Sequence, residues 1–266
     1  MDDRTELVLW TAGSILLSFI GALAAWIAVQ EPQSRLGRFR SGWSGNPAGH
    51  AIVFLVRFAF YLGIPYITLM RHALSLVVIG FLGAETADLP WWTLGWTLAD
   101  WAGALGWITG LGGIVAVTLF LGWWNVRRAI LAHQGGDGFP AGGMAPASSI
   151  LVVARESIFD EVHWAFYRAV PLLFISDPYW ATLAGAALVI VEWVVDPAWH
   201  ASIRDGSRRE AALMQVGWLA LSSAVFVMAH NVWPMIVLHV GLAWAIGHWA
   251  ALLAGRTQPH AVVSGE

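Results

Sequence analysis

Apolar stretches long enough to cross a lipid bilayer recur along this chain of 266 residues. A spanning helix needs about 20 mostly apolar residues, because the hydrocarbon core is about 30 Å thick. Inside that core, backbone polar groups can be paired only within helices or closed barrels. Since 58% of the residues are hydrophobic and only 12% are charged, the sequence predicts an all-α fold, a polytopic membrane helix bundle.

Seven spans are predicted from the positions of these stretches. They are Leu7 to Val29, His50 to Met70, Trp101 to Trp124, Ile150 to Ile175, Tyr179 to Trp199, Ala211 to Ala229 and Trp233 to Leu253. The apolar run from Ala73 to Gly83 is too short to cross alone, and we expect it to lie at the interface. Many of the 18 Trp residues lie near the ends of apolar stretches, which is typical of an aromatic belt.

Arginine residues follow the first, third and fifth predicted spans, whereas the other connections contain only Arg71. The positive-inside rule then predicts an outer N-terminus and an inner C-terminus. We expect a multi-pass protein of the bacterial cytoplasmic (inner) membrane, in contact with membrane lipid. Residues 1–149 would supply three spans with their loops, 150–254 a core of helices and 255–266 a polar tail, all within one integral membrane domain.

The chain contains no cysteine. This excludes disulfides, thiol catalysis and covalent haem attachment through a CxxCH motif. The net charge is only −3, and we expect no nucleic-acid partner.

The fourth predicted span contains a dense group of ionisable side chains, in RESIFDEVHWAFYR from Arg155 to Arg168. Each such group at the bilayer centre costs roughly 2.5 to 3.5 kcal/mol on insertion scales, so six within fourteen residues indicate a polar site. At about 100° per residue, the helix presents two polar faces. One face carries Glu156, Asp160, His163 and Tyr167, and the other carries Glu161 and Arg168.

Two later spans carry further polar groups. Glu192, Asp196 and His200 are spaced to share one face of the fifth predicted span, and His239 lies alone among apolar neighbours in the seventh. These groups could enclose a wet cavity for acid-base chemistry, or simply pair with one another and hold the helices together. Ligation of haem or a pigment by His on facing helices is a third possibility.

Three motifs resemble those of the CPBP family of integral membrane proteins, which includes type II CAAX prenyl endopeptidases and bacteriocin-processing and bacteriocin-immunity proteins. Asp160-Glu161 followed by Arg168 resembles the family's EExxxR motif, and the segment ending at His200 resembles FxxxH. The segment from Trp233 to His239 resembles the start of HxxxN. The resemblance covers roughly Ile150 to Leu253.

The chain departs from the family pattern at several positions. Asp160 replaces the first Glu, and Arg168 lies seven rather than four residues after Glu161. Asp196 stands in the place of Phe, and Ala243 in that of the final Asn.

The resemblance implies an intramembrane endopeptidase that hydrolyses a peptide bond in a peptide or membrane-protein substrate. Glu161, helped by Asp160 or Glu192, would activate water, and His200 and His239 would stabilise the tetrahedral intermediate. Arg168 would keep the carboxylates ionised. Metal-dependent relatives imply that a divalent metal ion is a possible cofactor, since Glu and His are suitable ligands.

Depth along the helices favours a different set of residues. At about 1.5 Å per residue, Glu161 and His239 fall in the outer half of the bilayer, whereas His200 falls near the inner face. A site of Glu161, His163, Glu192 and His239 is therefore an alternative to the motif set. The alternative function is a catalytically inactive scaffold, immunity protein or accessory subunit, with a partner in a membrane complex.

Overall fold

The computed structural model describes residues 3–44, 46–83, 93–133 and 149–255, and within these ranges the chain is helical and forms no strand. Six helices there are long and apolar enough to cross a membrane. They are α1 (Asp3–Gln30), Pro47–Met70, Leu98–Gly122, α8 (Pro178–Val195), Ala211–Ala229 of α10 (Gly206–Ala229) and Val232–Trp249 of α11 (Val232–Gly255). The protein is therefore an all-α polytopic membrane protein, as predicted.

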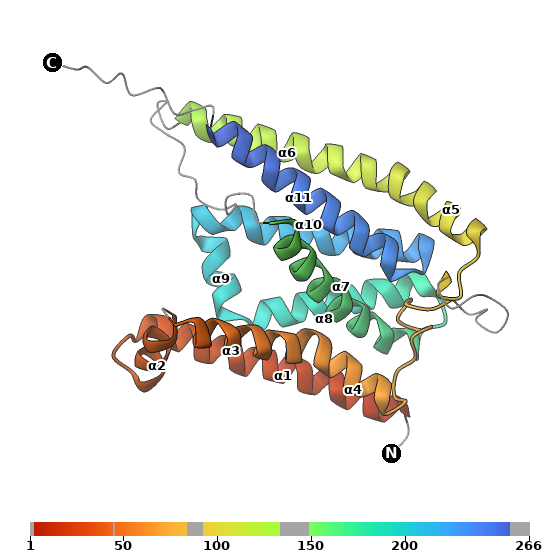
Figure 1. Ribbon diagram of the computed structural model, residues 1–266, viewed down its shortest axis with the longest axis horizontal. Coiled ribbons are helices and arrows are strands. Elements are labelled where there is room, and N and C mark those ends of the chain that lie inside the picture. The colour runs from red at the N-terminus through yellow and green to blue at the C-terminus, as the bar shows by residue number, and fades with distance from the viewer. Residues whose placement is uncertain (1–2, 45, 84–92, 134–148, 256–266) are drawn as a thin grey trace.

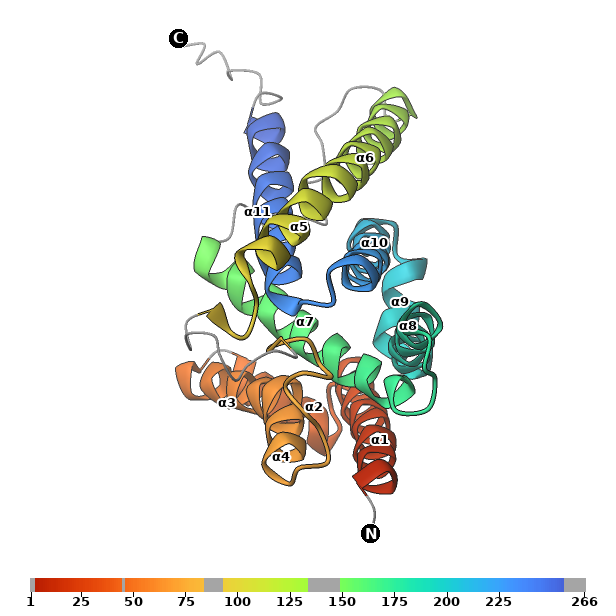
Figure 2. The same cartoon turned by 90° about the vertical axis from the view of Figure 1, so that its right-hand side faces the viewer.

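The seventh long helix, α7 (Ile150–Leu172), carries the charged cluster and is too polar to count among the apolar spans. Figures 1 and 2 show α7 crossing the middle of the molecule at an angle to its neighbours. It contacts α1, α4, α8 and α11. Its residues from Trp164 to Ala169 are almost completely buried, so the helix with the charged cluster lies in the centre of the bundle.

Two of the spans are interrupted by π-helical turns. The second consists of α3 (Pro47–Phe58), η1 (Ala59–Gly63) and α4 (Ile64–Met70), and the third of α5 (Leu98–Trp107), η3 (Ile108–Gly112) and α6 (Gly113–His133). The short helix α2 (Arg35–Ser44) packs on α1 and α3. The start of α1 and the end of α11 lie at opposite ends of the bundle (Figure 1).

The fifth predicted span, Tyr179 to Trp199, was wrong in its last part. α8 ends at Val195 and a separate helix, α9 (Pro197–Arg204), follows at an angle. Asp196 caps the new helix, because its Oδ1 accepts a hydrogen bond from the backbone N–H of Ala198 at 2.7 Å. Pro197 stands at the first helical position, where the missing N–H is tolerated. Glu192, Asp196 and His200 therefore do not share a helical face.

The apolar run from Ala73 to Gly83 forms turns rather than a helix. Gly80 has a φ of 84° and its carbonyl accepts a hydrogen bond from Val232 N at 3.1 Å. The indole Nε1 of Trp233 donates to the carbonyl of Phe81 at 3.2 Å. The run is thus fixed against the turn between α10 and α11 and does not cross the bundle.

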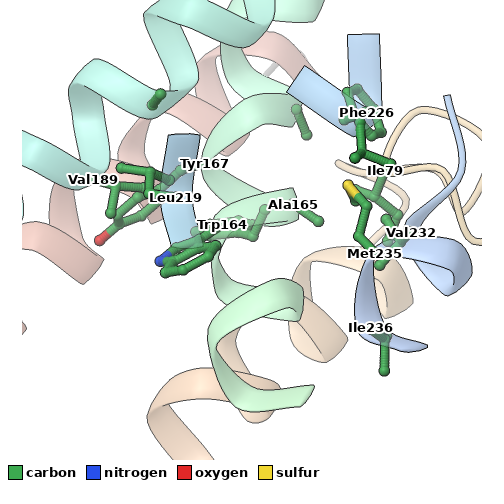
Figure 3. Packing of buried hydrophobic residues seen from close by; sticks show 14 of the residues in the cluster. Ile79, Trp164, Ala165, Tyr167, Val189, Leu219, Phe226, Val232, Met235 and Ile236 are labelled. Atoms are coloured by element: carbon green, nitrogen blue, oxygen red, sulfur yellow. The ribbon is translucent and has the colours of Figure 1, made fainter. Parts of the chain in front are cut away.

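The hydrophobic core surrounds α7. Figure 3 shows Trp164, Tyr167, Val189 and Leu219 on one side of this helix, and Ile79, Phe226, Val232, Met235 and Ile236 on the other. α8 passes very close to α7 at Gly185, where an added Cβ would lie 2.6 Å from Cα of Arg168. Helices α1, α4 and α5 also pack on the predicted core helices, through contacts such as α1 with α7 and α5 with α10. Apart from Gly255, the predicted polar tail lies outside the described residues.

Candidate functional site

Glu161 on α7 and His239 on α11 form a buried pair. Nδ1 of His239 lies 3.1 Å from Oε1 of Glu161, and the two residues are 6% and 1% exposed. With the carboxylate ionised, Nδ1 carries the proton and donates it, so Nε2 presents a lone pair. Their contact agrees with the common depth expected from the sequence.

Ser222 on α10 and Arg168 on α7 complete the surroundings of the Glu161 carboxylate. Ser222 Oγ donates to Oε2 of Glu161 at 2.6 Å and accepts from Nη1 of Arg168 at 2.9 Å. Nη2 of Arg168 lies 3.8 Å from the same carboxylate oxygen. The guanidinium also lies over the ring of Phe226, 4.7 Å from its centroid. A buried carboxylate is thus balanced by a buried cation, as an interior charge requires.

The imidazole of His239 lies between two indole rings. Its centroid is 5.8 Å from that of Trp164, with 14° between the planes, and 4.9 Å from that of Trp218, with 30° between them. This sandwich fixes the orientation of the ring, and the faces of the indoles favour a positive charge on it. Nε2 of His239 has no hydrogen-bond partner within the described ranges.

A small cavity adjoins the pair between α10 and α11. Its walls include Glu161, Trp218, Ser222, Met235 and His239. The space has room for about one water molecule. Water and two titratable groups can therefore meet at this point.

The other polar face of α7 forms a second buried pair. Nε2 of His163 lies 2.9 Å from Oε2 of Glu192 on α8. The ring centroids of Phe60 and Tyr61, both in η1, lie 5.0 Å from that of His163. The hydroxyl of Tyr167, next along the face, lies 3.1 Å from Oγ of Ser14 on α1. The two polar faces predicted for this helix therefore meet different partners.

Asp160 directly precedes Glu161 on α7, one turn before His163. Its side chain is partly buried and has no hydrogen bond or ion pair with any residue that the structure describes. Its charge is within electrostatic range of His239, Glu161 and His163. Of the predicted site carboxylates, Glu161, Glu192 and Asp196 each have a hydrogen-bond partner. Asp160 alone has none among the described residues.

His200 is not brought into either pair. The break at Asp196 turns it away on α9, where it is exposed and its Nε2 contacts the carbonyl of Val194 at 2.6 Å. Asp196 is occupied as a helix cap. The structure thus assembles Glu161, His239, His163 and Glu192, in two pairs, with Arg168 and Asp160 beside them.

A metal centre does not fit these residues well. Among the residues described, no group of three or more His, Cys, Asp or Glu side chains is arranged to hold a metal ion. Glu161 and His239 would supply two ligands, fewer than the three protein ligands usual in catalytic zinc sites.

Sequence reasoning missed Ser222 and Trp218. Trp218, Ser222 and Phe226 are spaced four residues apart on α10; Ser222 and Phe226 contact α7, and Trp218 contacts His239 on α11. This spacing was visible in the sequence, but a Ser in an apolar helix is too common to single out.

Compared with known proteins, the chain matches no family model, no curated protein and no solved structure.

Proposed function

We propose that the protein is an intramembrane endopeptidase of the CPBP type, in which Glu161 and His239 act together on a water molecule. The observation that carries the proposal is the hydrogen bond between these two buried side chains beside a cavity of water size. Glu161 and His239 are also the residues that two of the three family-like motifs contain.

The contacts of Glu161 support giving the water-activating step to the pair rather than to Glu161 alone. Both carboxylate oxygens of Glu161 already accept hydrogen bonds. Nε2 of His239 takes a proton from water while Glu161 holds the ring and stabilises the imidazolium. The water oxygen attacks the carbonyl carbon of the peptide bond, and the proton then passes to the leaving nitrogen. Ser222 donates a hydrogen bond to Glu161, and the Arg168 guanidinium balances its charge.

Asp160 is the second carboxylate of the proposal. Because it has no partner of its own in the described parts of the chain, it can bind the water or the substrate amide N–H. His163 and Glu192 already bind each other, and His200 is remote, so none of these three takes part in the step.

The substrate class follows from where the pair lies. Glu161 and His239 are buried within a bundle of membrane-spanning helices, so the scissile bond must belong to a peptide or membrane protein that enters from the bilayer. We place the protein in the bacterial cytoplasmic membrane with its N-terminus outside and C-terminus inside, because Arg residues follow alternate spans.

Cleavage can be tested with a defined mixture of synthetic transmembrane peptides and the protein in lipid nanodiscs. Incubation in ¹⁸O-labelled water marks each new carboxyl end for mass spectrometry. We expect Glu161→Gln and His239→Gln to slow labelling by about 100-fold or more. His200→Gln, the matched control at the remote histidine, should keep the parent rate. Equal rates in the parent and Glu161→Gln would refute the proposal.

A scaffold or accessory subunit is the second candidate. The small size of the cavity favours it, because a peptide enters only if α10 and α11 separate. Under this alternative the buried pairs merely hold α7, α8 and α11 together. Co-purification of a stoichiometric partner that persists when Glu161 and His239 are both replaced, without any peptide cleavage, would support it over the protease.

A further inference from the structure

A second line of polar side chains runs through the bundle on the face of α7 away from Glu161 and His239. It begins at Glu156, where Arg57 and Arg155 both form ion pairs with the carboxylate. These two arginine side chains are 40% and 41% exposed. Charged groups are costly in hydrocarbon, so this end of the line is expected to meet water or lipid headgroups.

The centre of the line is sealed. His163 is 2% exposed, and its Nδ1 is buried with no hydrogen-bond partner in the ranges that the structure describes. Its Nε2 contacts Glu192. The other groups around the ring are the aromatic residues of η1 and Tyr167, and Asp160 lies within electrostatic range one turn away. A buried nitrogen without a partner is a costly feature that helix cohesion alone does not require.

The line continues along α1. Glu192 interacts with Ser18 and with Tyr167, and the Tyr167 hydroxyl contacts Ser14. The buried residues of α1 include three polar ones, Glu6, Thr11 and Ser14. The last of the line, Glu6, is paired with Arg71, whose side chain is 59% exposed. The second end is therefore accessible as well.

The length of the line is close to the thickness of the hydrocarbon core of a membrane. At 1.5 Å per residue it covers about 16 Å along α7, from Glu156 to Tyr167, and about 12 Å along α1, from Ser14 to Glu6. Its length of about 28 Å compares with a hydrocarbon thickness of about 30 Å. α7 is inclined relative to the helices around it (Figure 2), so the line covers less depth than length.

We propose that this line conducts protons across the membrane and that each proton passes through His163. A proton arriving by way of Asp160 binds Nδ1 and forms the imidazolium. The proton on Nε2 then moves to Oε2 of Glu192 and leaves through the hydroxyls of Tyr167 and Ser14. The ring then turns about its side-chain bonds so that the protonated nitrogen faces Glu192 and the free nitrogen faces Asp160, and no proton moves backwards. This activity uses none of the residues of the Glu161–His239 pair and stands whether or not the protein cleaves peptides.

Proton flux can be measured with the purified full-length protein in liposomes that contain a pH-sensitive dye. A potassium gradient with valinomycin drives proton entry, and protein-free liposomes give the background. We expect the parent protein to acidify the lumen faster than background, and Asp160→Asn and Glu192→Gln to reduce the excess rate by about 100-fold. Ser223→Ala on α10, which removes a buried hydroxyl off the line, should keep the parent rate.

Tyr167→Phe tests the line with little risk to the fold, because it removes one oxygen atom and keeps the ring. We expect it to slow proton entry while the elution volume and helical circular dichroism stay those of the parent. A parent rate equal to background would overturn the proposal. So would parent-like rates in both Glu192→Gln and Tyr167→Phe.

Discussion

Oγ of Ser222 lies 2.6 Å from Oε2 of Glu161, and this hydroxyl oxygen of Ser222 also accepts a hydrogen bond from Arg168. The direct contact between Arg168 and Glu161 is 3.8 Å long, which is outside the range of a hydrogen bond. A single hydroxyl on α10 therefore connects the carboxylate and the guanidinium on α7. Its loss affects both charged groups at once.

Replacing this hydroxyl should weaken the fold. We expect Ser222→Ala to lower the free energy of unfolding in mixed micelles by about 1 to 3 kcal/mol, because Glu161 and Arg168 each lose a buried hydrogen bond. The neighbouring Ser223→Ala removes a buried hydroxyl that has no partner in the described chain, and should cost much less. Equal losses in the two variants would show that the link through Ser222 contributes nothing.

The charges of Arg168 and Glu161 should be coupled. We expect Arg168→Met alone to destabilise the protein by about 3 to 5 kcal/mol, because it leaves a buried carboxylate without its cation. Adding Glu161→Gln should recover part of this loss, so that the double variant is more stable than the sum of the single effects implies. The measurement is a double-mutant cycle of unfolding free energies. Strict additivity would contradict the pairing.

Close packing of α7 and α8 depends on Gly185. We expect Gly185→Ala to destabilise the protein and shift α8, because the new Cβ would lie 2.6 Å from Cα of Arg168 and 2.8 Å from its Cγ. Gly241→Ala in α11 is the matched control, since no atom lies within 4 Å of its added Cβ. Its higher helix propensity should stabilise the protein by up to about 1 kcal/mol. Melting temperatures in detergent compare the two.

The break between α8 and α9 gives a prediction that separates the observed site from the motif-based one. Asp196→Ala removes the cap on Ala198 N and should cost about 1 kcal/mol of stability, whereas Asp196→Asn should retain most of it. Neither change should alter peptide cleavage, because Asp196 and His200 lie outside the Glu161–His239 pair. Loss of cleavage in Asp196→Asn, with stability unchanged, would return these residues to the site.

The sequence predicted the membrane bundle and much of the polar centre. Span positions followed from apolar length, which the bilayer imposes directly. Helix rise placed Glu161 and His239 at a similar depth, which agrees with their contact, but the sequence did not predict that the two residues pair. The family-like motif at His200 was misleading, although Asp196-Pro197 was itself a recognisable sequence for starting a new helix.

Other parts of the centre depend on which helix faces which. The link through Ser222 and the indole sandwich around His239 arise from the rotation of α10 about its own axis, which a weakly amphipathic helix does not reveal. The polar face of α1 was hidden for the same reason, since Thr11, Ser14 and Ser18 lie singly among apolar residues. Tertiary packing alone turns them towards α7 and α8.

The π-helical turn η1 determines the angular register between the two halves of its span. Arg57 lies before the turn and contacts Glu156, whereas Thr68 lies after it and is fully buried. A π turn holds one residue more than the α-helix it interrupts, so deletion of a single residue from Ala59–Gly63 would rotate α4 by about 100° relative to α3. The chain could then keep the contact of Arg57 with Glu156 or the burial of Thr68, but not both. The number of residues in this short segment is therefore as constrained as their identity.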